Sequence, residues 1–236
     1  MLTLNLPERP SSPLKVMCMG AHSDDIEIGC GGTILQWLSL RPNVEVVWVV
    51  FSSGRQRERE ARHSAALFLK NAKRQTVVVK NFRNGFFPYE GAKIKEFFEQ
   101  MKNDVDPDVI FTHYRDDRHQ DHRTISDLTW NTWRNHLILE YEIPKYDGDL
   151  GSPNCFVPLT QPVCDRKIKY ICEVFQTQSS KAWLTEDTFQ ALLRLRGVEC
   201  VAAEKHAEAF YCRKLVLGTG IGATVPPARS RRRKSL

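Results

Sequence analysis

The sequence predicts an α/β fold with an open, mostly parallel sheet and helices on both of its faces. Three observations carry this prediction: short apolar runs, helix-like segments between them, and ionisable clusters directly after the first and fourth runs. The apolar runs are rich in β-branched residues and mostly lack in/out alternation, which is typical of strands buried on both faces. Strands and helices that alternate along a chain indicate βαβ units and a parallel sheet.

Four strands are expected in the first half of the chain, each followed by a helix. The strand segments are "KVMCMGA" from Lys15, "VEVVWVVFS" from Val44, "TVVVKNF" from Thr76 and "DVIFTH" from Asp108. The helix-like segments are residues 31–40, 56–71, 91–104 and 123–137. In the second half, the sequence predicts a fifth strand at 137–143, an ordered Pro/Gly-rich loop at 144–158, helices at 165–178 and 185–197, and a last structured part at 202–217.

The positive charge of the chain is concentrated at its C-terminus. The net charge is +6, but five positive residues fall in the stretch "ARSRRRKSL", which leaves +1 for the rest. We therefore expect a single domain with a sizeable core over residues 1–224, followed by a basic, disordered tail at 225–236. An anionic-surface anchor is the less favoured interpretation of this tail. The nearly neutral body predicts no nucleic-acid partner, and a nucleic-acid binder that uses the arginine tail is disfavoured.

Cysteine usage and hydropathy indicate a protein of the reducing cytosol. The seven cysteines are odd in number and scattered, and no CxxC pair occurs, which argues against a disulfide framework and a cysteine-based zinc ribbon. The first residues lack a basic region followed by a long apolar core. No segment approaches the roughly 18 uninterrupted apolar residues of a membrane span. We therefore expect a cytoplasmic location and no membrane span.

Two ionisable clusters follow the first and fourth predicted strands. "HSDD", residues 22–25, comes directly after the first strand, and "HYRDDRHQDH", residues 113–122, comes after the fourth. In an open parallel sheet, ligands bind outside the carboxyl ends of the strands. The two clusters are therefore expected to converge on one site. Either cluster alone is compatible with a polar turn or a helix cap, and only their conjunction predicts a functional site.

The side chains of His22, Asp25 and His122 form a candidate set of three metal ligands. Two imidazoles and one carboxylate suit a divalent ion of borderline softness, most simply zinc. Three protein ligands leave one coordination position open for water, which is typical of catalytic zinc sites. A bound zinc lowers the pKa of that water and polarises a substrate carbonyl. Asp24, next to Asp25, is the candidate general base that takes the proton of this water.

His119 is the second candidate catalytic group. It lies three residues before His122, so a turn or the start of a helix places both imidazoles on the same face. Protonated, His119 can stabilise a tetrahedral oxyanion or give a proton to a leaving amine. Asp121 can orient and charge-stabilise that imidazole.

The glycine run "GCGG", residues 29–32, follows the first cluster. It does not match the GxGxxG phosphate fingerprint, so we expect no dinucleotide site. A tight turn that packs the next helix against the sheet is the simpler interpretation.

Two segments resemble the signatures of a known family. "AHSDDIEIGCGGTI", residues 21–34, resembles the AHPDD-E-x-G-x-GG signature of the PIG-L/LmbE family of N-deacetylases. "THYRDDRHQDH", residues 112–122, resembles the second signature of that family, which ends in HPDH. The order, separation and strand context of the two segments agree with the family. The resemblance covers the first half of the chain, and the two signatures together are highly specific.

The resemblance implies a Rossmann-like three-layer α/β fold and zinc-dependent hydrolysis of an N-acetyl amide, usually on an amino sugar. By position, the ligands and catalytic groups of the family fall on residues already singled out by their chemistry: His22, Asp25 and His122 for zinc, Asp24 as the general base, and His119 tuned by Asp121. Two positions depart from the family pattern, because Ser23 and Gln120 replace the usual prolines. Neither is a ligand, so the departures concern the rigidity of the turns rather than the chemistry.

An arginine after the second strand is a candidate substrate contact. "GRQREREAR", residues 54–62, resembles the R-x-x-E element of the family, in which the arginine approaches the substrate. This suggests Arg57 with Glu60, although Arg55 and Arg59 leave the register open. A charged helix face is an equally good interpretation.

The loop "YEIPKYDGDLG", residues 141–151, is similar to a loop of some bacterial sugar-tailoring members of the family. We expect its polar side chains to contact substrate hydroxyls or a diphosphate, and the candidates are Glu142, Lys145, Tyr146 and Asp147. A surface loop built from turn residues is the alternative.

The leading hypothesis is a zinc-dependent hydrolase that removes an acetyl group from an N-acetylated amino sugar, such as N-acetylglucosamine, or from its conjugate. An amidase that acts on another amide, such as a thiol-sugar conjugate, is the alternative within the same fold. A 2-His-1-carboxylate iron oxygenase is a weaker alternative, because the strand-helix alternation does not match the all-β barrel in which such triads usually sit. The sequence leaves open the sugar, the metal used in the cell and the formation of a homo-oligomer.

Overall fold

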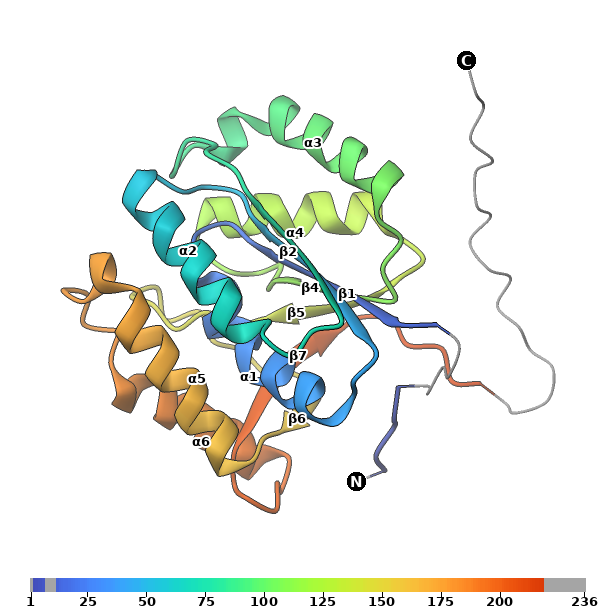
Figure 1. The fold of residues 1–236 in the computed structure, drawn as a ribbon, viewed down its shortest axis with the longest axis vertical. Coiled ribbons are helices and arrows are strands. Elements are labelled where there is room, and N and C mark those ends of the chain that lie inside the picture. Colours follow the sequence, from blue (N-terminus) through green and yellow to red (C-terminus); the bar gives the residue numbers. More distant parts are fainter. Residues whose placement is uncertain (1, 7–11, 219–236) are drawn as a thin grey trace.

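The computed structural model describes residues 2–6 and 12–218. Strands and helices alternate through most of this part of the chain (Figure 1). The strands are β1 (Leu14–Gly20), β2 (Val44–Val50), β3 (Arg74–Val79), β4 (Val109–His113), β5 (Leu137–Tyr141), β6 (Cys155–Pro158) and β7 (Ala207–Cys212). The helices are α1 (Asp25–Leu40), α2 (Arg55–Phe68), α3 (Gly91–Asp104), α4 (Gln120–Thr132), α5 (Gln161–Val174) and α6 (Glu186–Glu199), with short 3-10 helices η1 (Phe87–Tyr89) and η2 (Gln176–Gln178).

The strands form one seven-stranded sheet in the order β3-β2-β1-β4-β5-β7-β6. Strands β1 to β5 run parallel, whereas β7 is antiparallel to both β5 and β6. The predicted α/β fold with a mostly parallel sheet is therefore confirmed. Strand β6 lies within the segment predicted as a loop. It is a short edge strand that ends in Pro158, and a proline at such an edge weakens the strand signal in the sequence.

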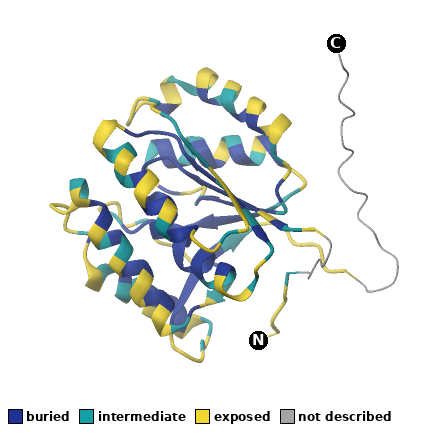
Figure 2. Ribbon diagram, in the orientation of Figure 1, coloured by how far each residue is buried: buried dark blue, intermediate teal, exposed yellow. Residues whose placement is uncertain are grey.

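Helices cover both faces of the sheet and complete a three-layer architecture (Figure 1). Helices α1, α2, α5 and α6 pack on one face, in a core that contains Phe68 and Phe210. Helices α3 and α4 pack on the other face, around Phe98 and Ile125. Figure 2 shows that the central strands are buried while the outward sides of the helices are exposed.

The two cores explain why the strands lack an alternating pattern. Successive residues of β1 point to opposite faces, so Val16 and Cys18 enter one core while Met17 and Met19 enter the other. Both faces are covered by helices, so every position in the middle of the strand is apolar.

Helix α1 begins at Asp25, well before the predicted start at residue 31. The expected tight turn at the glycine run is therefore wrong, because the run forms part of the helix. Glycine costs a helix interior about 1 kcal/mol relative to alanine, so propensity alone argues against this helix. Packing overrides propensity here, since a Cβ at Gly29 would overlap the Tyr141 ring and one at Gly31 would overlap Phe68. These glycines bring the start of α1 close to the sheet and to α2.

The C-terminal part of the chain is described up to residue 218. Strand β7 lies inside the last structured part predicted at 202–217. The predicted basic tail at 225–236 lies outside the described residues. Among the described residues, no helix has both the length and the apolar character that crossing a membrane requires.

We predict that Gly29→Ala destabilises the protein, because the added methyl group has to displace the buried ring of Tyr141. Overpacking of this kind lowers the free energy of unfolding by about 1–3 kcal/mol. Urea denaturation measures the change. Gly91→Ala is the matched control, since a Cβ at that position meets nothing within 4 Å. An equal effect of both substitutions would contradict this account of α1.

Candidate metal centre

The two ionisable clusters lie together at the carboxyl ends of β1 and β4. These strands are neighbours in the sheet. Strand β1 continues into α1 on one face, and β4 continues into α4 on the other face. The clusters therefore stand at the switch point of the sheet, where a ligand crevice forms. This topology brings His22 next to His122, although 100 residues separate them in the sequence.

The three predicted metal ligands converge on one point. Nδ1 of His22 lies 3.2 Å from Nε2 of His122. The carboxylate of Asp25 lies 3.4 Å from the first of these nitrogens and 3.5 Å from the second. Zinc–nitrogen bonds of about 2.0–2.1 Å at tetrahedral angles separate two ligand atoms by about 3.3 Å. All three side chains are buried, and their donor atoms fit a zinc ion in both type and spacing.

Burial and neighbouring charges set the protonation of these ligands. Burial would raise the pKa of Asp25, but three imidazoles, foremost that of His122, hold it below the usual value of an aspartate. Burial and the neighbouring His113 lower the pKa of His122 to about 3. Burial acts in the same direction on His22, but carboxylates, foremost that of Asp25, raise its pKa to about 10. The set thus combines an ionised Asp25 and a neutral His122 with a protonated His22, so a metal that binds through His22 has to displace its proton.

His113 is a fourth member of the cluster, to which the sequence analysis gave no role. Its Nε2 accepts a hydrogen bond from the backbone N–H of Ala21 at 2.9 Å and lies 3.2 Å from Asp25. Its ring stacks on that of His122, with the centroids 3.9 Å apart. His113 therefore ties the end of β4 to the end of β1. The sequence could have indicated His113, because it is the last residue of the strand that leads into the second cluster.

Asp117 is the second residue that the sequence analysis missed. Its carboxylate accepts hydrogen bonds from Nδ1 of His122 at 2.9 Å and from the backbone N–H of His119 at 2.7 Å. Because Nδ1 of His122 donates to Asp117, its Nε2 is the nitrogen that faces the metal position. The pair Asp116-Asp117 is visible in the sequence, but only the fold shows that Asp117 turns inward while Asp116 stays exposed.

Asp121 supports His22 with its carboxylate, which differs from the predicted pairing with His119. The carboxylate accepts hydrogen bonds from the backbone N–H groups of Gly85 at 2.6 Å and Phe87 at 3.1 Å, and it lies 3.4 Å from Nε2 of His22. The backbone N–H of Asp121 donates to Nδ1 of His119, which caps α4. Neutral His119 therefore carries its proton on Nε2. Burial, together with the neighbouring His22, lowers the pKa of His119 and favours this neutral form.

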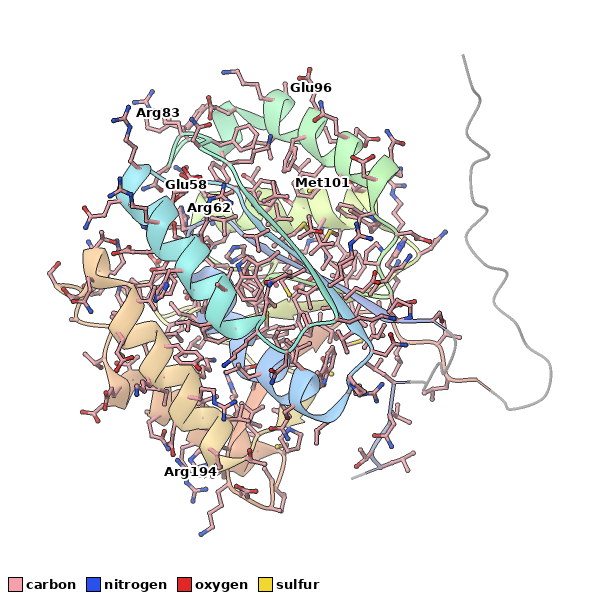
Figure 3. The ribbon with its side chains drawn as sticks, in the orientation of Figure 1. Glu58, Arg62, Arg83, Glu96, Met101 and Arg194 are labelled. Carbon is pink, nitrogen blue, oxygen red and sulfur yellow. The ribbon has the colours of Figure 1, made fainter. Side chains whose placement is uncertain are left out.

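Asp24 forms an ion pair with Arg57 at the edge of the ligand cluster. Nη2 of Arg57 donates to Oδ1 of Asp24 at 2.8 Å. Burial raises the pKa of Asp24, and the guanidinium of Arg57 acts against this shift. Of the three arginines that the sequence left open, the structure turns Arg57 toward the candidate general base. Arg57 lies in α2, and two other side chains of this helix, Glu58 and Arg62, are labelled next to each other in Figure 3. Both are about half exposed, and they form an ion pair at 2.8 Å.

Glu60 and Glu142 make contacts inside the protein. The carboxylate of Glu60 accepts hydrogen bonds from the backbone N–H and the hydroxyl of Thr177. The carboxylate of Glu142 forms a buried ion pair with Arg196 at 2.8 Å and accepts a hydrogen bond from the hydroxyl of Tyr211 at 3.1 Å. The structure therefore assigns Glu142 a role in joining β5, β7 and α6, rather than the predicted substrate contact.

Of the three remaining candidates in the predicted substrate loop, Lys145 is partly buried, whereas Tyr146 and Asp147 are exposed. Nζ of Lys145 forms ion pairs with Asp117 and Asp149. Tyr146 is 71% exposed, and its hydroxyl accepts a hydrogen bond from the backbone N–H of Ala182 at 3.3 Å. Neither Lys145 nor Tyr146 contacts the predicted metal ligands.

Residues 17–133 match the family model described as PIG-L: GlcNAc-PI de-N-acetylase. The chain belongs to the PIG-L family. The matched segment contains both ionisable clusters and all three predicted metal ligands. The family resemblance inferred from the two signatures is thereby confirmed.

Solved structures share the fold of this PIG-L protein at low sequence identity. The N,N'-diacetylchitobiose deacetylase of Pyrococcus horikoshii is 21% identical over 84% of this chain and 82% of its own, with a TM-score of 0.63. GalB of Pseudomonas putida, a 4-carboxy-2-hydroxymuconate hydratase, is 17% identical over 88% of this chain and 99% of its own, with a TM-score of 0.67. A conserved protein of Thermus thermophilus is 17% identical over 89% of this chain and 99% of its own, with a TM-score of 0.66. The TM-scores show that the fold is shared, and a fold alone does not select a reaction.

We predict that zinc raises the melting temperature of the metal-free protein and that His122→Ala abolishes this effect. A ligand that binds only the folded state stabilises it by about 2.7 kcal/mol at a concentration about 100 times its Kd. Thermal unfolding with and without zinc measures the shift. The matched control is His63→Ala, which removes an exposed histidine of α2 and should keep the wild-type shift. A shift of equal size in His122→Ala would exclude His122 as a ligand.

Proposed function

We propose that this PIG-L protein is a zinc-dependent hydrolase that removes the acetyl group from an N-acetylated amino sugar or from a conjugate of it. One observation carries the proposal: a buried carboxylate, Asp24, adjoins a three-ligand metal set and is held by Arg57. A metal set with an open position and a neighbouring base is the combination that hydrolysis of an amide requires.

The comparisons support this proposal. The family model carries a de-N-acetylase in its description, and both signatures fall inside the matched segment. Deacetylases are also found among the structures with the same fold, including one named for N,N'-diacetylchitobiose and one named for the A40926 pseudoaglycone. An N-acetylated sugar is therefore the substrate class that we assign first.

Zinc, when bound by His22, Asp25 and His122, supplies a Lewis acid that polarises the amide carbonyl and lowers the pKa of water. Asp24 accepts the proton of the attacking water. Burial raises the pKa of this carboxyl group and so makes it a better proton acceptor, while Arg57 favours its ionised form and fixes its orientation.

We assign the second catalytic role to His119. Its Nδ1 is occupied by the N–H of Asp121, so Nε2–H is free to donate a hydrogen bond to the developing oxyanion. The leaving nitrogen takes the proton that Asp24 accepted from water, so Asp24 is ionised again at the end of the reaction. Water is added across the amide bond, and the products are acetate and a free amine.

The iron oxygenase alternative loses its support. The sheet is mostly parallel and covered by helices, unlike the all-β barrel in which such triads usually sit. The oxygenase reading takes His22 and Asp24 as a His-x-Asp pair of iron ligands, but the carboxylate of Asp24 pairs with Arg57 instead.

We predict that Asp24→Asn lowers the rate of acetate release by about 10²–10⁴-fold, because the amide cannot accept the proton of water. The assay uses the zinc-loaded protein with three substrates: free N-acetylglucosamine, its conjugate with a nucleoside diphosphate, and a simple glycoside of it. Zinc content is measured in parallel and should stay at the wild-type level, because the ligands His22, Asp25 and His122 remain.

The matched control for this experiment is Asp104→Asn, which changes an exposed aspartate at the end of α3. It should release acetate at the wild-type rate. Zinc-loaded wild-type protein that releases acetate from no N-acetylated sugar would refute the proposed substrate class. Wild-type activity in Asp24→Asn would refute the role of the base.

We predict that Arg57→Met moves the acidic limb of the pH profile of kcat/KM to higher pH. The base must be ionised to act, and the loss of the guanidinium raises the pKa of Asp24 further. Activity is therefore lost at a higher pH as the pH falls. Arg62→Met removes a guanidinium from the exposed side of the same helix and should leave the profile in place. A profile of Arg57→Met that coincides with that of the wild type would show that Arg57 does not tune Asp24.

A further inference from the structure

The carboxylate of Asp117 collects three hydrogen bonds behind the metal ligands. Its side chain is 2% exposed. Oδ2 accepts from Nδ1 of His122 at 2.9 Å and from Nζ of Lys145 at 3.0 Å, and Oδ1 accepts from the backbone N–H of His119 at 2.7 Å. One buried carboxylate thus orients a predicted metal ligand and fixes the start of α4.

Lys145 stands between two carboxylates. Its Nζ donates to Asp117 and Asp149 and approaches the backbone carbonyl of Ile143 at 3.4 Å. A lysine ammonium has three donors, and all three are therefore engaged inside the protein. The side chain is 10% exposed. Asp149 also accepts a hydrogen bond from the backbone N–H of Arg118 at 2.7 Å, which ties the loop after β5 to the second ionisable cluster.

We infer that Lys145 is a positioning residue that sets the zinc affinity of the site by holding Asp117 against Nδ1 of His122. The inference rests on the zinc site of the proposed function. Both Asp117 and Asp149 contact the same ammonium, so its removal leaves two poorly hydrated carboxylates facing each other. Their repulsion favours a displacement of Asp117 from His122, and burial strengthens that repulsion.

The expected size of the effect follows from the role of Asp117. A partner that receives the outer N–H of a metal-binding histidine fixes its tautomer and ring orientation, and the loss of such a partner costs about 10–100-fold in metal affinity. Lys145 acts one step further from the metal, through Asp117. In a variant without Lys145, the charge of Asp149 repels that of Asp117. A second substitution that removes the charge of Asp149 should therefore relieve the repulsion.

The experiment measures the zinc dissociation constant of the metal-free protein by competition with a chelating dye. Lys145→Met should weaken zinc binding about 10-fold, the lower end of the range for loss of the direct partner. Asp149→Asn in the Lys145→Met background should restore most of the affinity, because the second charge is then absent. Lys169→Met is the matched control, since it removes a lysine from an exposed pair with Glu173 and should leave the affinity unchanged.

A spectroscopic readout separates positioning from a general loss of structure. The Nδ1 proton of His122 should give a downfield NMR signal in the wild type, move upfield in Lys145→Met and return in the double variant. Unchanged zinc affinity in Lys145→Met, or a loss that Asp149→Asn does not reverse, would overturn the inference. Wild-type protein that binds no zinc would instead refute the metal site of the proposed function, so the two failures are distinguishable.

Discussion

The buried charge of Asp25 is the constraint on which the site depends. A carboxylate that is 4% exposed is stable only when opposite charge or hydrogen bonds compensate for its lost hydration. Three imidazoles lie within 3.2–3.5 Å of it. They come from the end of β1, the end of β4 and the first turn of α4. The site therefore depends on the order of the strands, because the three imidazoles surround one carboxylate only when β1 and β4 are neighbours.

A second set of acids connects the ligands to the loops around them. Asp121 lies beside His22 and accepts hydrogen bonds from the loop after β3, whereas Asp117 accepts from His122 and from Lys145 of the loop after β5. Each imidazole thus has a metal-facing nitrogen and an outer nitrogen held by an acid that also anchors a loop. The predicted ligands and the two loops around them are in this way parts of one hydrogen-bonded network.

The sheet could be predicted because a strand that is buried on both faces is apolar at every position. Successive residues of β1 enter two different cores, so the sequence of this strand shows no alternation. The sequence predicted the residue types of the ligand set for a similar reason, since ionisable groups directly after buried strands are rare without a partner. What it missed depends on contacts between distant segments. The choice of Asp117 over Asp116 and the inward turn of Lys145 follow from the packing of the loop after β5. The early start of α1 follows from the Tyr141 ring, which takes the space that side chains at the glycine run would fill.

The fold by itself leaves the reaction undetermined, since a deacetylase and a hydratase share it with this chain. A divalent cation that polarises a carbonyl could serve either reaction, so the metal ligands do not decide between them. The groups around the metal carry more information. Burial raises the pKa of Asp24, and the ion pair with Arg57 fixes the orientation of its side chain. His119 presents Nε2–H because its other nitrogen caps α4. A proton acceptor for water and a separate donor for an oxyanion are the two groups that the cleavage of an amide needs, and this is why hydrolysis is the reaction that the site supports best.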